Sequence, residues 1–280
     1  MPVNKIQIKT EINKMLSISD YELNGNIIVV VIPAMGIKQK IYFDFAKFLS
    51  NKSIHTITFD YSGIGESLNG NIKDYKNNLH DWAKYDLEAI INYVTTQYSS
   101  KKIILIGHSV GGQLIGLNSN SRKASKIILI ASQSGYWGFW RGLDKIKMFL
   151  NWNLLFPILT RIYGYMPSIK FSRMENLPRN VALEWAKWCS NSNYLFQYIS
   201  EKDWFFSQIN CKITSISIDD DFYAPQKAVN WLTDKYSNAK ITKKHLKPND
   251  FGLKNIGHFS IFHKKNEPFL WNLLLSEIEN

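Results

Sequence analysis

The stretch that decides the fold runs from residue 101 to residue 112 and reads Lys101-Lys102-Ile103-Ile104-Leu105-Ile106-Gly107-His108-Ser109-Val110-Gly111-Gly112. Its first half is a short apolar run, typical of a strand buried on both faces of a sheet. Its second half matches the pattern G-x-S-x-G and continues into small residues that can open a helix. The flanking glycines permit a sharp turn where larger side chains would clash. We therefore predict a strand, a tight turn at Ser109 and then a helix. The turn would expose the serine hydroxyl at the carboxyl edge of the sheet.

Apolar runs and amphipathic stretches alternate on both sides of this turn. Strands are predicted at 26–32, 54–59, 102–106, 125–131, 213–218 and 239–246, and helices at 37–50, 77–98, 109–117, 225–236 and 268–279. This alternation predicts an α/β fold, with a mostly parallel sheet flanked by helices. Two early segments, 6–11 and 15–19, are predicted to form an antiparallel hairpin at the sheet edge.

The alternation stops between residues 135 and 206, where no convincing buried strand is found. Helical pieces are predicted here at 143–152, 156–163, 179–188 and 194–200. Six of the nine tryptophans fall in this stretch: Trp137, Trp140, Trp152, Trp185, Trp188 and Trp204. We interpret residues 135–206 as a helical, aromatic-rich cap insertion, and residues 1–134 and 207–280 as the core domain.

The composition and charge of the chain limit the classes of protein to which it can belong. A chain of 280 residues with 45% hydrophobic residues can bury one large core. The net charge of +11 comes from lysines that are scattered along the chain, so no nucleic-acid surface is predicted, although peripheral contact with anionic lipid is compatible with it. Cys189 and Cys211 are predicted to be free thiols of a cytoplasmic protein, because no secretory signal is evident. The oligomeric state does not follow from the sequence.

No metal or other cofactor is expected. The sequence has no H-E-x-x-H motif and no cluster of cysteines and histidines. The stretch Gly63-Ile64-Gly65 lacks the third glycine of a dinucleotide fingerprint.

A serine nucleophile needs a base, and His258 is the candidate. It lies in Asn255-Ile256-Gly257-His258-Phe259, after the last predicted strand and before the closing helix. That position gives the chain order serine, acid, histidine. His263 is a weaker candidate because it falls in a polar segment that leads into a helix. His108 is expected to pack beneath the turn.

The base needs a carboxylate to hold it, and three aspartates follow the strand at 213–218. Asp221 is the candidate, since it stands four residues before the proline that opens the next helix. Asp219 and Asp220 are expected to be turn or capping groups, but the sequence leaves the choice between Asp220 and Asp221 open.

The oxyanion of an acyl-transfer intermediate needs backbone N–H donors. Val110 is one candidate, because it directly follows Ser109. Met35 is the other, in the loop Pro33-Ala34-Met35-Gly36 after the strand at 26–32.

Four stretches together resemble the α/β-hydrolase superfamily: Gly107 to Gly112, Phe59 to Ser67, Asp220 to Pro225 and Ile256 to Phe259. More narrowly, the chain is similar to a bacterial group of α/β hydrolases near the serine-aminopeptidase and lysophospholipase-like branch. The resemblance covers nearly the whole chain and implies the α/β-hydrolase fold and a Ser-His-Asp triad. Many members place Arg where Ser62 stands.

These observations lead to the hypothesis of a serine hydrolase that cleaves a small-molecule carboxylic ester with a hydrophobic acyl group. An aromatic-lined pocket suits such a group, and Tyr136, Trp137 and Trp140 are the candidate substrate-binding residues. An aminopeptidase or amidase on the same triad is the alternative, with Glu175, Glu184 or Glu201 holding a substrate amine. A non-catalytic binding protein on this fold is the third hypothesis.

Overall fold

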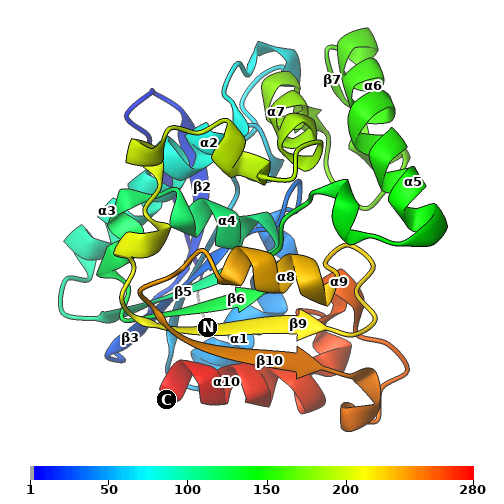
Figure 1. The fold of residues 1–280 in the computed structure, drawn as a ribbon. Coiled ribbons are helices and arrows are strands. Elements are labelled where there is room, and N and C mark those ends of the chain that lie inside the picture. The colour runs from blue at the N-terminus through cyan, green and yellow to red at the C-terminus, as the bar shows by residue number, and fades with distance from the viewer. Residues whose placement is uncertain (1–2) are drawn as a thin grey trace.

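The protein is described by a computed structural model that covers residues 3–280 and is built on an eight-stranded sheet (Figure 1). The strand order is β1-β2-β4-β3-β5-β6-β9-β10. The strands are β1 (Asn4–Lys9), β2 (Met15–Tyr21), β3 (Ile27–Ile32), β4 (His55–Phe59), β5 (Lys102–His108), β6 (Lys126–Ile130), β9 (Lys212–Ile218) and β10 (Lys240–Leu246). β1 and β2 form the antiparallel hairpin at one edge, and from β4 to β10 every neighbouring pair is parallel. The predicted fold class and edge hairpin are confirmed.

Helices cover both faces of the sheet. They are α1 (Phe43–Asn51), α2 (Leu79–Asp81), α3 (Glu88–Gln97), α4 (Val110–Gly116), α8 (Gln226–Thr233), α9 (Gly257–Ser260) and α10 (Asn272–Glu279). β3 shows why both faces are apolar: Ile28 and Val30 pack into one core, and Val29 and Val31 into the other. Because side chains alternate along a strand, a strand covered on both faces must be apolar throughout.

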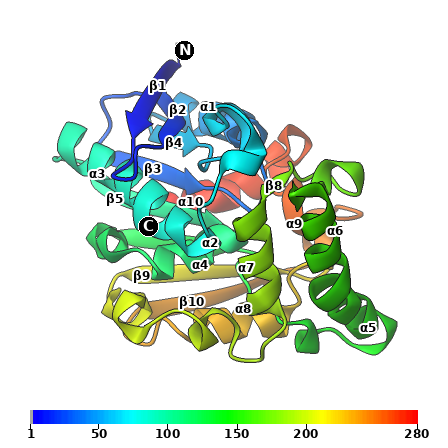
Figure 2. The ribbon, with the colours of Figure 1, turned by 90° about the horizontal axis from the view of Figure 1, so that it is seen from above.

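Residues 135–206 lie between β6 and β9, which are neighbours in the sheet. They hold α5 (Gly142–Leu150), α6 (Phe156–Tyr163) and α7 (Arg179–Cys189). A π-helical segment, Asn151–Leu155, joins α5 to α6, so the two predicted helices are consecutive. In Figure 1 the tips of β6 and β9 point toward the side of the molecule where α5 and α6 stand, and Figure 2 shows these two helices on the same side.

Two details of this segment differ from the sequence analysis. A two-stranded pair, β7 (Tyr165–Met166) and β8 (Leu177–Pro178), was not predicted, because two residues are too few to show alternation. The helix expected at 194–200 is only a short 3-10 turn, Tyr194–Gln197. The division into core and cap stays a prediction. Within residues 3–280, no helix combines the length and the apolar character needed to cross a bilayer.

Candidate active site

Ser109 stands at the turn between β5 and α4. Its backbone has φ 52° and ψ −117°, a strained conformation for a residue with a side chain. The neighbouring backbone leaves no room for larger residues: a Cβ on Gly111 would lie 2.4 Å from the Ile32 carbonyl oxygen, and one on Gly107 would lie 2.7 Å from Gly112 Cα. The turn therefore has the sharp shape that the sequence predicts, and it needs both glycines for steric reasons.

Asp221 and His258 meet at the carboxyl edge of the sheet. His258 Nδ1 lies 2.7 Å from Asp221 Oδ2, and both side chains are buried. Asp221 Oδ1 accepts hydrogen bonds from the backbone N–H groups of Tyr223 and Ala224, at 2.8 and 3.1 Å. A carboxylate held on both oxygens fixes the imidazole with Nδ1 protonated, which leaves Nε2 free to accept a proton.

Asp220 has a different position. Its two carboxylate oxygens accept the N–H groups of Ile256 and Gly257, each at 3.0 Å. Asp221 therefore holds the imidazole, while Asp220 holds the backbone of the loop that carries it. Which of the two adjacent acids contacts the histidine could not be read from the sequence, because both follow the same strand.

Gln133 was missed by the sequence analysis. Its Oε1 lies 3.5 Å from the Ser109 hydroxyl, which donates to it, and its Nε2 donates to the Tyr223 carbonyl at 3.2 Å. Gln113 Nε2 donates to the Gln133 carbonyl at 2.6 Å. The available signal was a polar residue placed just after the buried strand β6, at the same sheet edge as Ser109.

A buried chain of hydrogen bonds joins three loops of the site. The Ala34 N–H donates to the Tyr42 hydroxyl at 3.0 Å, and that hydroxyl lies 2.9 Å from His108 Nδ1. His108 Nε2 lies 2.9 Å from the His258 carbonyl oxygen. Burial lowers the pKa of His108 well below its usual value, with a further lowering from His258, so the ring is neutral.

Only one tautomer of the neutral His108 ring satisfies both of its hydrogen-bond partners. Nε2–H donates to the His258 carbonyl, because a carbonyl can only accept, and Nδ1 accepts the Tyr42 hydroxyl proton. His108 packs beneath the turn, as the sequence predicts. Its bonds to Tyr42 and to the backbone of His258 were not predicted, since they join residues 66 and 150 positions apart.

Met35 and Val110, the candidate oxyanion donors, are both buried. Among residues 3–280, neither backbone N–H has a hydrogen-bond acceptor. Tyr61 supports the loop before Met35, since its hydroxyl donates to the Pro33 carbonyl at 3.3 Å.

The three candidate substrate-binding aromatics lie just after β6. Trp140 is buried, and its indole N–H donates to the Phe222 carbonyl at 2.9 Å, next to the residues that hold Asp221. The Tyr136 ring packs against Trp137, with centroids 5.2 Å apart, and Trp137 packs against Phe149 of α5. These rings connect α5 to the loop that carries the acid.

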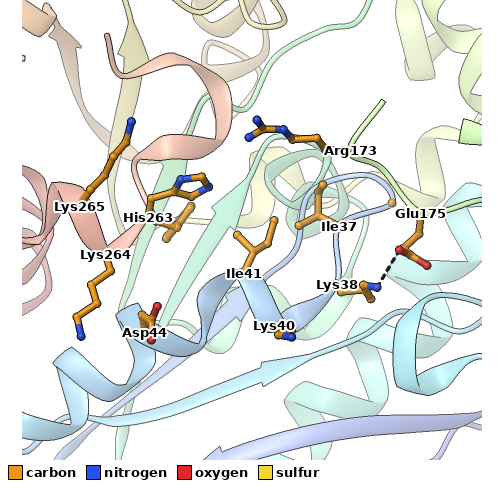
Figure 3. A pocket seen from close by; sticks show the side chains of 12 residues that line it. Ile37, Lys38, Lys40, Ile41, Asp44, Arg173, Glu175, His263, Lys264 and Lys265 are labelled. Atoms are coloured by element: carbon orange, nitrogen blue, oxygen red, sulfur yellow. Dashed lines mark ion pairs between the residues drawn. The ribbon is translucent and has the colours of Figure 1, made fainter. Parts of the chain in front are cut away.

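A separate cavity of about 520 Å³ lies behind the Met35 loop (Figure 3). Gly36 and Ile37 form one wall, and its rim carries five cations, Lys38, Lys40, Arg173, Lys264 and Lys265, and two carboxylates, Asp44 and Glu175. Lys38 and Glu175 form an ion pair at 2.9 Å. Ser109 and His258 do not line this cavity, so it is distinct from the candidate catalytic residues.

Comparisons with known proteins identify the family and the fold. The family model described as serine aminopeptidase, S33, matches residues 25–197. No curated protein matches the chain. A soluble variant of monoglyceride lipase from Saccharomyces cerevisiae shares 12% identity, with a TM-score of 0.67, 100% of this chain and 95% of that chain covered.

Two bacterial structures show the same fold. An esterase from Exiguobacterium antarcticum has 15% identity and a TM-score of 0.62, covering 99% of this chain and 100% of that chain. A putative hydrolase from Agrobacterium vitis S4 has 14% identity and a TM-score of 0.63, with the same coverage of both chains. The chain has the α/β-hydrolase fold and belongs to the serine aminopeptidase S33 family of hydrolases.

Proposed function

We propose that the protein is a serine hydrolase that cleaves a carboxylic ester with a hydrophobic acyl group. The observation that carries the proposal is the buried hydrogen bond between His258 and Asp221, together with the bond from the His108 side chain, next to Ser109, to the His258 carbonyl. The proposal assigns a residue to each role in an acyl-transfer reaction.

In the proposed reaction the Ser109 hydroxyl turns from Gln133 toward the substrate and attacks the ester carbon. His258 Nε2 takes the hydroxyl proton, and Asp221 stabilises the imidazolium that results. The Met35 and Val110 N–H groups stabilise the oxyanion.

The tetrahedral intermediate then collapses. The bond between the ester carbon and the alcohol oxygen breaks, and His258 returns the proton to the departing alcohol. Water, deprotonated by His258, then attacks the acyl carbon, the bond between that carbon and Ser109 Oγ breaks, and His258 returns the proton to Oγ as the carboxylic acid leaves.

The proposed substrate class rests on the residues after β6. Tyr136, Trp137 and Trp140 offer apolar surface next to the loop of Asp221, and residues 135–206 would act as a cap over the site. The esterase and monoglyceride lipase among the structural neighbours fit this class. Two free thiols, Cys189 and Cys211, are compatible with a reducing, cytoplasmic location.

An aminopeptidase is the second candidate, and the family description favours it. It would need a carboxylate to hold the substrate amine. Two of the three candidate acids already have partners: Glu175 pairs with Lys38 at 2.9 Å, and Glu184 accepts from His80 Nδ1 at 2.7 Å. Those ion pairs support the ester substrate over the amine-bearing one.

A fluorophosphonate probe tests the enzyme proposal. The wild type should be labelled, the Ser109→Ala variant should not, and Ser207→Ala should label like the wild type because Ser207 is an exposed serine elsewhere. An unlabelled wild type would favour a binding protein.

A panel of p-nitrophenyl esters of rising chain length, with amino-acid p-nitroanilides beside them, tests the substrate class. Faster turnover of the longer esters supports the proposal. Faster turnover of the amino-acid anilides would replace it with the aminopeptidase.

A further inference from the structure

The consecutive helices α5 and α6, with the π-helical segment between them, are apolar on two opposite sides. One stripe is buried against the rest of residues 135–206 and consists of Met148, Trp152, Phe156 and Thr160. The other stripe, here called the outer stripe, is exposed and consists of Leu143, Ile146, Leu150, Leu154, Ile158 and Ile162. Both repeat at about four residues, so they follow opposite sides of the same rod.

The outer stripe is exposed to an unusual degree. Leu143 is 75% exposed and Ile162 is 71% exposed, and the other four side chains are 44% to 55% exposed. Two more exposed apolar residues follow α6 in the chain, Ile169 and Phe171, which are 57% and 63% exposed. Single exposed apolar residues are ordinary, but a contiguous run of this size marks a surface that meets an apolar partner.

Positive charge surrounds this surface. Residues 141–173 contain six cations, Arg141, Lys145, Lys147, Arg161, Lys170 and Arg173, and one carboxylate, Asp144. Asp144 is paired with Lys147 at 3.1 Å, so five cations remain in excess. Arg173 also lines the cavity that holds Lys38, Lys40, Lys264 and Lys265, where the five cations outnumber the two carboxylates, Asp44 and Glu175 (Figure 3).

We propose that the outer stripe docks on the surface of an anionic lipid bilayer. The apolar side chains would enter the boundary between headgroups and acyl chains, and the surrounding Lys and Arg side chains would meet lipid phosphates. The occupant is a membrane and not a second copy of the chain, because a two-fold contact would place this strongly positive surface against itself. Since the strand tips point toward the side where α5 and α6 stand, docking turns the carboxyl edge of the sheet toward the lipid (Figures 1 and 2).

Vesicle sedimentation of the full-length protein tests the docking surface. The wild type should bind vesicles of phosphatidylcholine with phosphatidylglycerol and bind phosphatidylcholine alone much more weakly. The double variant Ile158→Gln, Ile162→Gln should lose about tenfold or more in partitioning, since two apolar side chains leave the bilayer. Met15→Gln with Phe269→Gln is the matched control, because both residues are exposed and apolar but lie outside residues 135–206.

A second pair of variants tests the charge. Arg161→Gln with Lys170→Gln should weaken binding to the anionic vesicles by about tenfold or more, at about 1 kcal/mol for each cation near the surface. Lys47→Gln with Lys240→Gln, two exposed lysines of the core domain, should bind like the wild type.

Three outcomes would overturn the proposal. They are a wild type that ignores anionic vesicles, an Ile158→Gln, Ile162→Gln variant that binds as well as the wild type, and a wild-type dimer in ultracentrifugation that this variant converts to a monomer without any vesicle binding. Catalysis is measured separately: Ser109→Ala should bind vesicles like the wild type, and the outer-stripe variant should keep wild-type turnover of a water-soluble short ester. Failure of hydrolysis and failure of docking are thus distinguishable.

Discussion

The sheet edge that carries the candidate residues Ser109, Asp221 and His258, here called the catalytic edge, differs from the 135–206 segment in how its buried polar groups are bonded. At the catalytic edge, the buried side chains of Asp221, His108 and Tyr42 each have hydrogen-bond partners on both sides. In the 135–206 segment, six buried polar atoms have no partner among residues 3–280; they belong to Trp137, Trp152, Thr160, Ser168, Trp188 and Trp204.

The difference shows which interactions fix the structure of each region. Directional hydrogen bonds hold the catalytic edge in one geometry, as proton transfer requires. The 135–206 segment is held by aromatic and aliphatic packing, for example Trp152 against Trp185 with centroids 4.6 Å apart, and such packing adapts more readily to a ligand. We therefore expect that removing a buried polar group lowers stability or activity more in the first region than in the second.

The largest expected effect separates the two adjacent acids of the catalytic edge. Asp221→Asn should lower kcat by about 10⁴, because the imidazole loses the carboxylate that fixes its tautomer. Asp220→Asn should lower kcat by about tenfold at most, since it weakens only the hold on the Ile256 and Gly257 N–H groups. Steady-state ester hydrolysis measures both, and a larger loss for Asp220→Asn would reverse the two roles.

Outside residues 135–206, three side chains also have a buried polar atom with no partner among residues 3–280: Ser62, Asn77 and Asp86. Asp86 is the one of these that can ionise. It is fully buried, one carboxylate oxygen has no partner among residues 3–280, and burial raises its pKa to about 7. Between about pH 4 and pH 7 the unfolded chain loses this proton while the folded chain keeps it, so Asp86 lowers the stability of the wild type as pH rises.

Asp86→Asn should therefore become more stable than the wild type across that window, by up to about 4 kcal/mol at the upper end. Denaturant unfolding at pH 5 to 8 measures the difference. A difference that does not change with pH would show that Asp86 keeps an ordinary pKa.

Tyr42→Phe tests the hydrogen-bond chain that joins the Met35 loop to the His258 loop. Loss of the hydroxyl should lower kcat by about 10- to 100-fold with little change in KM, because the donors and the base lose their alignment. Tyr75→Phe is the matched control: its hydroxyl is also buried and hydrogen-bonded, to the Ser67 carbonyl at 3.1 Å, but outside this chain. Equal kcat losses in the two variants would indicate a general effect on stability.

The smallest expected effect is a difference in stability between variants of two buried threonines. Thr233 of α8 bonds Ser215 at 2.7 Å and the Val229 carbonyl at 2.8 Å, so Thr233→Val should cost about 1–2 kcal/mol. Thr160 of α6 has a buried hydroxyl with no partner among residues 3–280, so Thr160→Val should be neutral or slightly stabilising. Denaturant midpoints measure both, and an equal cost would mean that a bonded and an unbonded buried hydroxyl contribute alike to stability.

The sequence by itself determined the features that depend on local sterics and periodicity. Gly107 and Gly111 indicate the turn at Ser109 because a side chain at either position would overlap backbone. The apolar runs around Val30 and Leu105 indicate buried parallel strands because both faces of such strands are covered.

Only the tertiary structure decided the features that depend on which distant residues meet. It placed Asp221, and not Asp220, against His258, and it brought Tyr42 to His108 and Gln133 to Ser109, since these contacts join different loops of the sheet edge. It also decided which side of the α5–α6 rod is buried. Ile158 and Phe156 belong to apolar stripes with the same spacing, so periodicity alone cannot tell the stripe that packs inward from the stripe that stays exposed.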